Sequence, residues 1–375
     1  MPTASSTFYI TKTSPGCHSL SLDCREFREL FLENRFQQVS DPADAAVIII
    51  GACVVAAGTE DRTIALVKEM RARKAQGAVI LVSGCFTNQA KSRISSVADC
   101  LFFSVREIDQ AREHFGFLKI PKERMWQNQS VESLHGRIKY WKILHRLLVR
   151  IAEVSHKIFS NGNSILDRFV DTTYAYSSRA YLLRCASGCS NFCSYCEIRN
   201  ARGRLESRTL DSIIDEVRAA LKSGYDHFVL VADDLSAYGL DRENLRLSNL
   251  LEAIFSLGDR FTIELHNLHP KHILSDMDRF LRALSGRVRC VHFDFQSGSD
   301  RVLKLMNRGY TKEEFLFGAT AILKKVPSIS LRTDVIVGFP SEEEGDLNET
   351  IDVLRKIPFE RVGIAFFENR PGAPA

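Results

Sequence analysis

A group of closely spaced cysteines offers the clearest chemistry in this sequence. Cys189, Cys193 and Cys196 form a CxxxCxxC pattern in a loop that directly follows a predicted strand. Three thiolates at this spacing can bind one face of a cubane iron-sulfur cluster and leave its fourth iron free for another ligand. A structural zinc site usually has four ligands in paired spacings, and no matching second pair follows here. Cys185 is a less favoured fourth ligand because it falls inside the predicted strand.

Three further cysteines, far apart in the sequence, each follow an apolar segment that we expect to form a strand. They are Cys17, Cys53 and Cys85. The loops after the strands of a doubly wound sheet gather at one edge, so these three thiols can meet there. Each one alone is more often a small buried apolar side chain. Their equivalent positions favour a second cluster site, again with one iron left open.

The elements that must position these cysteines alternate between strand and helix. In the amino-terminal region we expect strands at 7–13, 45–52, 78–84 and 100–104 and helices at 23–34, 59–74 and 108–115. This alternation predicts a parallel sheet wound by crossover helices, which closes near residue 117.

A second alternating region begins at Ala180. We expect strands at 180–186, 227–232, 261–265, 290–295, 328–337 and 361–367, with helices at 210–223, 242–257, 271–284, 312–325 and 343–356. Six successive βα units predict a partial TIM-like barrel whose site lies at the carboxyl ends of its strands.

The chain is therefore expected to be an α/β protein with three parts. These are an N-terminal doubly wound parallel-sheet domain (1–117), a helical basic linker (118–178) and a partial TIM-like (β/α)6 barrel (179–375). The linker contains a predicted amphipathic helix over 134–159 with interleaved lysines and arginines. We favour a solvated linker helix. The alternative is a basic surface for a polyanion or an anionic lipid.

Composition narrows the class of protein. The chain has 375 residues, of which 45% are hydrophobic and 26% charged, and this excludes disordered and fibrous sequences. A net charge of +4 is too small to indicate nucleic-acid or membrane binding. The longest apolar segments are too short to span a bilayer, and the first residues lack the pattern of an export signal. We therefore expect a cytoplasmic protein whose ten cysteines are metal ligands or reactive thiols.

Both cysteine groups, taken with several longer segments, resemble the methylthiotransferase family of radical S-adenosylmethionine (SAM) enzymes. The CxxxCxxC spacing after the first barrel strand is typical of radical SAM enzymes in general. The other matching segments are 201–204 (Ala-Arg-Gly-Arg), 207–208 (Ser-Arg), 233–239 (Asp-Asp-Leu-Ser-Ala-Tyr-Gly), 269–270 (His-Pro), 296–309 (Gln-Ser-Gly-Ser-Asp-Arg-Val-Leu-Lys-Leu-Met-Asn-Arg-Gly), 333–340 (Thr-Asp-Val-Ile-Val-Gly-Phe-Pro) and 370–375 (Arg-Pro-Gly-Ala-Pro-Ala). The resemblance extends over nearly the whole chain.

The resemblance implies two 4Fe-4S clusters and SAM as cofactors. Cys189, Cys193 and Cys196 would hold the cluster that cleaves SAM to a radical, and Cys17, Cys53 and Cys85 would hold an auxiliary cluster that carries or donates sulfur. It also implies an electron donor such as flavodoxin or ferredoxin. Residues expected to contact SAM are Tyr195, Asp234, Gln296, Asp334 and Gly338. Each of these five also has a purely structural interpretation, as a packing, capping or turn residue.

Three departures from the family pattern stand out. Leu20 and the pair Gly51-Ala52 replace the usual asparagine and Asn-Thr beside the first two auxiliary cysteines, and Ser341 replaces a usual glycine. Such changes alter the polar groups that surround a cluster. The chain also stops before the family's small TRAM β-barrel, so we expect either a fragment or an enzyme that grips its substrate differently.

These features leave three hypotheses for the reaction. Asp234 favours a methylthiotransferase that acts on a peptide or protein side chain, since the tRNA branch usually has asparagine there. The alternative is a tRNA adenosine methylthiotransferase that uses the basic helix. A third is a radical SAM enzyme of another reaction type, with the auxiliary cluster as an electron relay.

Overall fold

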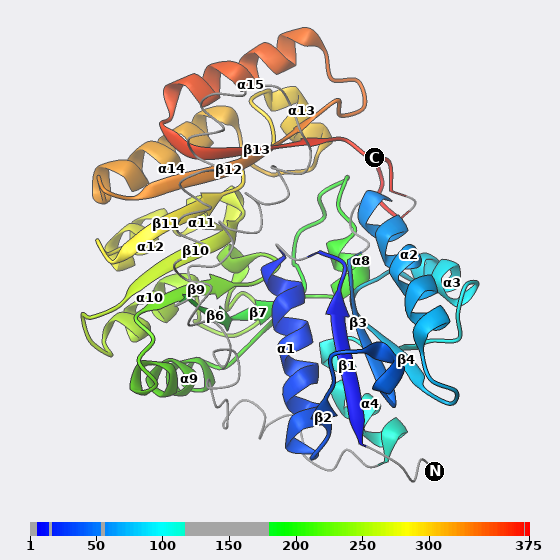
Figure 1. The fold of residues 1–375 in the computed structure, drawn as a ribbon. Coiled ribbons are helices and arrows are strands. Elements are labelled where there is room, and N and C mark those ends of the chain that lie inside the picture. Colours follow the sequence, from blue (N-terminus) through cyan, green and yellow to red (C-terminus); the bar gives the residue numbers. More distant parts are fainter. Residues whose placement is uncertain (1–5, 15–16, 54–56, 117–179, 371) are drawn as a thin grey trace, which may run out of the picture.

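Two parallel sheets, each covered by helices, form the described part of the protein (Figure 1). The computed structural model describes residues 6–14, 17–53, 57–116, 180–370 and 372–375. The predicted basic helix at 134–159 lies outside these residues. No helix in the described ranges is long and apolar enough to cross a membrane.

The first sheet is the doubly wound one that the sequence predicts. Its strand order is β2-β1-β3-β4-β5, with all pairs parallel. The strands are β1 (Thr7–Lys12), β2 (Gln37–Gln38), β3 (Val47–Cys53), β4 (Val79–Cys85) and β5 (Leu101–Phe102). Because the winding reverses between β1 and β3, the loops after these two strands diverge and leave room for a ligand at the carboxyl edge.

Helices cover both faces of this sheet. They are α1 (His18–Glu33), α2 (Ala57–Arg73), α3 (Asn88–Ser95) and α4 (Ile108–Phe115). Along β3, Ile49 packs in the cluster with α1 and α4, whereas Ile48 and Ile50 pack in the cluster with α2 and α3. This period of two is the strand alternation that buries a sheet on both faces.

The second sheet contains the six predicted barrel strands. Its order is β13-β12-β11-β10-β9-β6, again with all pairs parallel. The strands are β6 (Ala180–Arg184), β9 (His227–Val231), β10 (Thr262–Leu268), β11 (Val288–Phe293), β12 (Ser330–Val337) and β13 (Phe359–Phe366). A two-residue antiparallel pair that the sequence did not indicate, β7 (Ala186–Ser187) with β8 (Glu206–Ser207), follows β6.

Apart from α8, which lies between the two halves, the helices of this half lie along one side of its sheet (Figure 1). They are α8 (Ile198–Arg202), α9 (Leu210–Lys222), α10 (Leu247–Phe255), α11 (Pro270–Ser275), α12 (Met277–Ala283), α13 (Asp300–Leu305), α14 (Lys312–Lys325) and α15 (Glu344–Lys356). The short helices α8 and α13 were not expected, and two of the expected helices differ from the prediction. The helix at 242–257 begins only at Leu247, and the helix at 271–284 is divided at Asp276, whose backbone leaves the helical region.

Helix α1 joins the two halves. Leu22 of α1 packs against Val229 and Val231 on the inner face of the barrel sheet, which is the face opposite the helices. Arg25 Nη2 donates a hydrogen bond of 3.3 Å to the carbonyl of Leu182 in β6. Figure 1 shows α1 beside β6 and β7, with β1 on its other side. The helix therefore covers both the end strand and part of the inner face of the barrel sheet.

Candidate functional site

The CxxxCxxC cysteines lie in the loop between β7 and α8. Backbone contacts shape this loop: Cys189 N donates to Gly203 O at 3.2 Å, and Cys196 N donates to Cys193 O at 3.2 Å. The sulfur of Cys189 also accepts a hydrogen bond of 3.4 Å from Asn191 N. Burial and the charge of Asp234 raise the pKa of Cys189 to about 12, and burial and the charge of Cys193 raise that of Cys196 to about 11. Such thiols ionise when a metal binds, because the metal replaces the proton.

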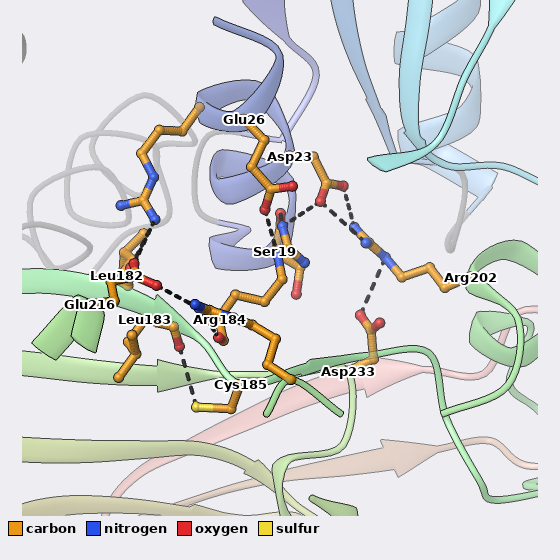
Figure 2. A network of polar contacts seen from close by, with 12 residues as sticks. Ser19, Asp23, Glu26, Leu182, Leu183, Arg184, Cys185, Arg202, Glu216 and Asp233 are labelled. Atoms are coloured by element: carbon orange, nitrogen blue, oxygen red, sulfur yellow. Dashed lines mark hydrogen bonds and ion pairs between the residues drawn. The ribbon is translucent and has the colours of Figure 1, made fainter. Parts of the chain in front are cut away.

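Cys185 does not belong to this group. Its side chain is fully buried in the barrel core, and its Sγ donates to the carbonyl of Leu183 at 3.6 Å (Figure 2). Burial raises the pKa of its thiol to about 12. The expected three-cysteine set therefore fits a cluster that leaves one iron without a protein ligand.

The second group of cysteines lies at the carboxyl edge of the first sheet. Cys53 and Cys85 are opposite each other in the register of β3 and β4, and Cys17 immediately precedes α1. Burial raises the pKa of both Cys17 and Cys85, and the charge of Cys53 raises both further, so Cys53 lies within electrostatic range of each. The structure thus brings together three thiols that are 68 positions apart in the chain from first to last.

Small and apolar residues make this close approach possible. Gly84 has φ of +122°, and a Cβ there would lie 2.3 Å from Ala52 O and 2.8 Å from Leu20 Cδ1. Leu20 is fully buried, and its backbone N–H donates to Cys17 Sγ at 3.4 Å. A Cβ at Gly51 would lie 2.5 Å from the sulfur of Cys24. Leu20, Gly51 and Ala52, which depart from the family pattern, thus pack closely around this site.

A buried arginine connects the two groups of cysteines. Arg202, the last residue of α8, donates from Nε to Cys85 Sγ at 2.8 Å and from Nη2 to Asp23 Oδ2 at 2.6 Å. Its Nε also lies 3.3 Å from Asp233 Oδ1 (Figure 2). The other oxygen of Asp233 accepts a hydrogen bond of 2.7 Å from Gly188 N, next to Cys189. Sequence spacing did not identify Arg202, although it lies in the matched segment 201–204.

Two other residues missed by the sequence analysis face Cys193. Arg308 Nη1 lies 3.4 Å from Cys193 Sγ, and His269 Nε2 lies 3.8 Å from the same sulfur. Burial and the charge of Arg308 lower the pKa of His269 far below its usual range. Cys193 is thus placed beside a permanent cation and a neutral imidazole. Both residues lie in segments that match the family pattern, and nothing else in the sequence indicated a functional role for them.

Two of the five expected SAM contacts lie in the CxxxCxxC loop or beside it. Tyr195 packs against Val302, Met306 and Phe339, and its hydroxyl accepts a hydrogen bond of 3.1 Å from Arg308. Asp234 accepts from Asn191 Nδ2 at 2.6 Å and from Ser236 N at 3.0 Å. Asp234 therefore caps the short turn at 235–237. Capping is the purely structural interpretation that the sequence also allowed for this residue.

The other three expected SAM contacts lie on β12 or next to it. Gln296 has φ of +73°, and its backbone pairs with β12 through Asp334 O at 2.8 Å. Asp334 is half-exposed, and the absence of a Cβ at Gly363 leaves space for its carboxylate. Gly338 has φ of +76° in a turn, a conformation that favours glycine. Gln296 and Gly338 follow the carboxyl ends of β11 and β12, where such a barrel has its site, and Asp334 lies within β12.

The inner face of the barrel sheet carries charged side chains from neighbouring strands. His292 Nε2 lies 3.3 Å from Asp294 Oδ1 and 3.2 Å from Asp334 Oδ2. Burial raises the pKa of Asp294 to about 6, although the charge of His292 acts in the opposite direction. On β10, Glu264 pairs with His266, whose ring contacts His18 of α1 at 4.9 Å between centroids. This face offers both donors and acceptors to a polar ligand.

Two family models match the chain. The model described as "Radical SAM superfamily" matches residues 183–354, and the one described as "Uncharacterized protein family UPF0004" matches residues 8–103. Several curated relatives are described as tRNA-2-methylthio-N(6)-dimethylallyladenosine synthases. That of Thermotoga petrophila is 28% identical over 370 residues, which is 98% of this chain and 76% of the relative. That of Fusobacterium nucleatum is 26% identical over 362 residues, 96% of this chain and 76% of the relative.

Two solved structures with a similar fold are described as radical S-adenosylmethionine enzymes. TsrM from Kitasatospora setae, described as a radical S-adenosylmethionine methyltransferase with cobalamin and a 4Fe-4S cluster bound, aligns with a TM-score of 0.53 at 13% identity, over 99% of this chain and 77% of that one. OxsB, described as a cobalamin-dependent S-adenosylmethionine radical enzyme, aligns with a TM-score of 0.53 at 12% identity, over 93% and 51%. These likenesses concern the fold alone.

The match to the radical SAM model over residues 183–354, which include the CxxxCxxC loop after the first barrel strand, identifies this protein as a radical SAM enzyme. The second family model and the relatives extend the match to the amino-terminal sheet. The chain belongs to the methylthiotransferase family of radical SAM enzymes, whose cofactors are SAM and 4Fe-4S clusters.

Proposed function

We propose that this enzyme transfers a methylthio group to an adenosine of tRNA. The observation that carries the proposal is the short connection between the two cysteine groups, from Cys85 through Arg202 and Asp233 to the backbone beside Cys189. A reaction that takes sulfur from one centre and a radical from the other needs both near one substrate. The relatives described as tRNA-modifying synthases, matched over 96–98% of the chain, supply the substrate class.

The roles of the chain's own residues follow from their places. Cys189, Cys193 and Cys196 would hold the radical cluster, and Cys17, Cys53 and Cys85 the auxiliary one. When bound, these cofactors supply the radical that removes a hydrogen and the sulfur that replaces it. Tyr195, Asp234, Gln296, Asp334 and Gly338 would line the SAM site. A reduced flavodoxin or ferredoxin would supply the electron.

The charged inner face of the barrel is where we place the substrate base. Its imidazoles and carboxylates can hydrogen-bond to the ring nitrogens and exocyclic groups of a nucleobase. Asp234, which had favoured a peptide substrate, is already engaged by Asn191 and Ser236. Its identity is therefore accounted for by local structure and does not argue against RNA.

The test is to incubate the anaerobically reconstituted enzyme with SAM, a reductant and either unmodified tRNA or candidate peptides. Mass spectrometry of nucleosides and peptides then measures the gain of one methylthio group. We expect a modified adenosine, which Cys17→Ala and Cys193→Ala each abolish. Modification of a peptide but not of tRNA would overturn the proposed substrate. Formation of 5′-deoxyadenosine without any sulfur-bearing product would overturn the proposed reaction.

A further inference from the structure

Arg202 occupies a buried position between the two halves of the molecule. Its side chain is 4% exposed, and its partners Asp23 and Asp233 are 1% and 5% exposed. The Arg202 guanidinium lies 2.6 Å from Asp23 and 3.3 Å from Asp233, and a guanidinium is protonated at any ordinary pH. The guanidinium therefore stays charged next to Cys85.

A second arginine provides a natural comparison. Arg184 of β6 shares Asp23 with Arg202: its Nη2 lies 2.6 Å from Asp23 Oδ1, and its Nε lies 2.9 Å from Glu26 (Figure 2). Both arginines are buried to the same degree and belong to the same network. Of the two, Arg202 is the one that donates a hydrogen bond to a cysteine sulfur.

Arg202 is also held in place relative to the cysteines of the CxxxCxxC loop. The carbonyl of the next residue, Gly203, accepts a hydrogen bond of 3.2 Å from Cys189 N. Through its side chain, Arg202 reaches Asp233, which holds Gly188 N at 2.7 Å. A Cβ at Gly188 would lie 2.2 Å from Arg204 O, so this backbone has little freedom to move. The side chain of Arg202 and the main chain of Gly203 thus tie the two cysteine groups to one short segment.

We propose that Arg202 is a positioning residue for the auxiliary cluster: it holds the Cys85 sulfur at a set place relative to the Cys189 loop and raises the reduction potential of the cluster bound there. The inference rests on the proposed function in one respect, namely that Cys17, Cys53 and Cys85 bind that cluster. A donated hydrogen bond and a fixed positive charge stabilise the reduced form more, because it carries more negative charge on sulfur.

The experiment isolates the auxiliary cluster in full-length protein. The background is Cys189→Ala/Cys193→Ala/Cys196→Ala, reconstituted anaerobically and assayed for iron and sulfide. In this background we compare Arg202→Gln and Arg202→Lys with the matched control Arg184→Gln, which loses the same shared partner but no contact to sulfur. A redox titration followed by electron paramagnetic resonance gives the potential, and thermal unfolding compares the folds.

We expect Arg202→Gln to change the reduced-to-oxidised ratio at a given potential at least tenfold toward the oxidised form, a shift of about 59 mV or more for one electron. Arg202→Lys keeps the positive charge but lacks the planar guanidinium group, so it should shift the reduction potential less. Arg184→Gln should leave the potential unchanged. Loss of iron in Arg202→Gln but not in Arg184→Gln would equally support the positioning role.

Three results would overturn the inference, and they are distinguishable. An unchanged potential with iron retained in Arg202→Gln, or equal effects of the two arginine variants, would remove the role of Arg202 and leave the proposed function intact. Absence of iron from the parent background would contradict the ligand assignment itself, and the inference would fall with it.

Discussion

Replacing Asp23 with asparagine should weaken the contact between the two halves of the protein. Asp23 is fully buried, and its two oxygens accept hydrogen bonds of 2.6 Å from Arg184 and Arg202. A hydrogen bond to a charged group contributes about 1.5–3 kcal/mol, and removing one partner of a buried ion pair costs about 3–5 kcal/mol. We therefore expect the free energy of unfolding to fall by about 3–5 kcal/mol at neutral pH.

The pH dependence of this loss has a definite sign. Burial alone would raise the pKa of Asp23, but the two guanidinium groups outweigh it and lower the pKa below its ordinary value of 3.8. The contribution of the carboxylate is therefore complete above that ordinary value and is lost as the pH falls through the lowered one. The difference between wild type and Asp23→Asn should be constant near neutrality and shrink in acid.

Urea unfolding followed by circular dichroism measures this difference, with hydrogen exchange of α1 as a local reporter. The control is Asp215→Asn, which breaks an ion pair with Arg218 in which the partners are 72% and 57% exposed. We expect no measurable change for the control, since exposed pairs contribute little. A loss below about 1 kcal/mol for Asp23→Asn, or an equal loss in the control, would refute the reasoning.

Three further outcomes are expected. Cys17→Ala and Cys193→Ala should each lose about half of the iron of the reconstituted enzyme, because each removes a ligand of one of two independent 4Fe-4S clusters; loss of all iron in either variant would contradict this. Gly84→Ala should retain the radical cluster and lose the auxiliary one, since its Cβ would lie 2.3 Å from a backbone oxygen; iron analysis and absorbance spectra check it. Because burial raises the pKa of Asp294 to about 6, its stabilising contribution in the cofactor-free protein is lost as the pH rises through that value. Asp294→Asn should therefore be more stable relative to wild type at pH 8 than at pH 5, and an opposite trend in melting temperature would count against it.

The sequence predicts the sheets well because their signal is local. Buried runs such as 47–53 and 79–85 are rich in β-branched residues and stand out without any tertiary information. Helix α3 was missed because only Ala90 and Ile94 are buried along it, which is too few for a periodic pattern. The start of α1 was placed too late because the thiol of Cys17 caps the helix, and cysteine is not among the usual capping residues.

The candidate site also contains residues that the sequence predicts and residues that only the folded structure brings in. The two cysteine groups could be predicted because strand ends and short spacing place their residues. Arg202 could not, since 117 residues separate it from Cys85 and its contact depends on how the two halves dock. Asp23 is a polar residue near the start of an amphipathic segment, and nothing in that segment indicates that two arginines from the other half surround it.

The way α1 covers the barrel has a practical consequence for work on fragments. Among the described strands, β6 ends the sheet, and α1 contributes both the guanidinium of Arg25 at its Leu182 carbonyl and the side chain of Leu22 over Val229 and Val231. A barrel expressed by itself from residue 179 would present a bare strand edge next to an apolar patch, a combination that promotes aggregation. A minimal soluble catalytic fragment should therefore carry α1 as a grafted segment, or replace the exposed positions with lysine or glutamate.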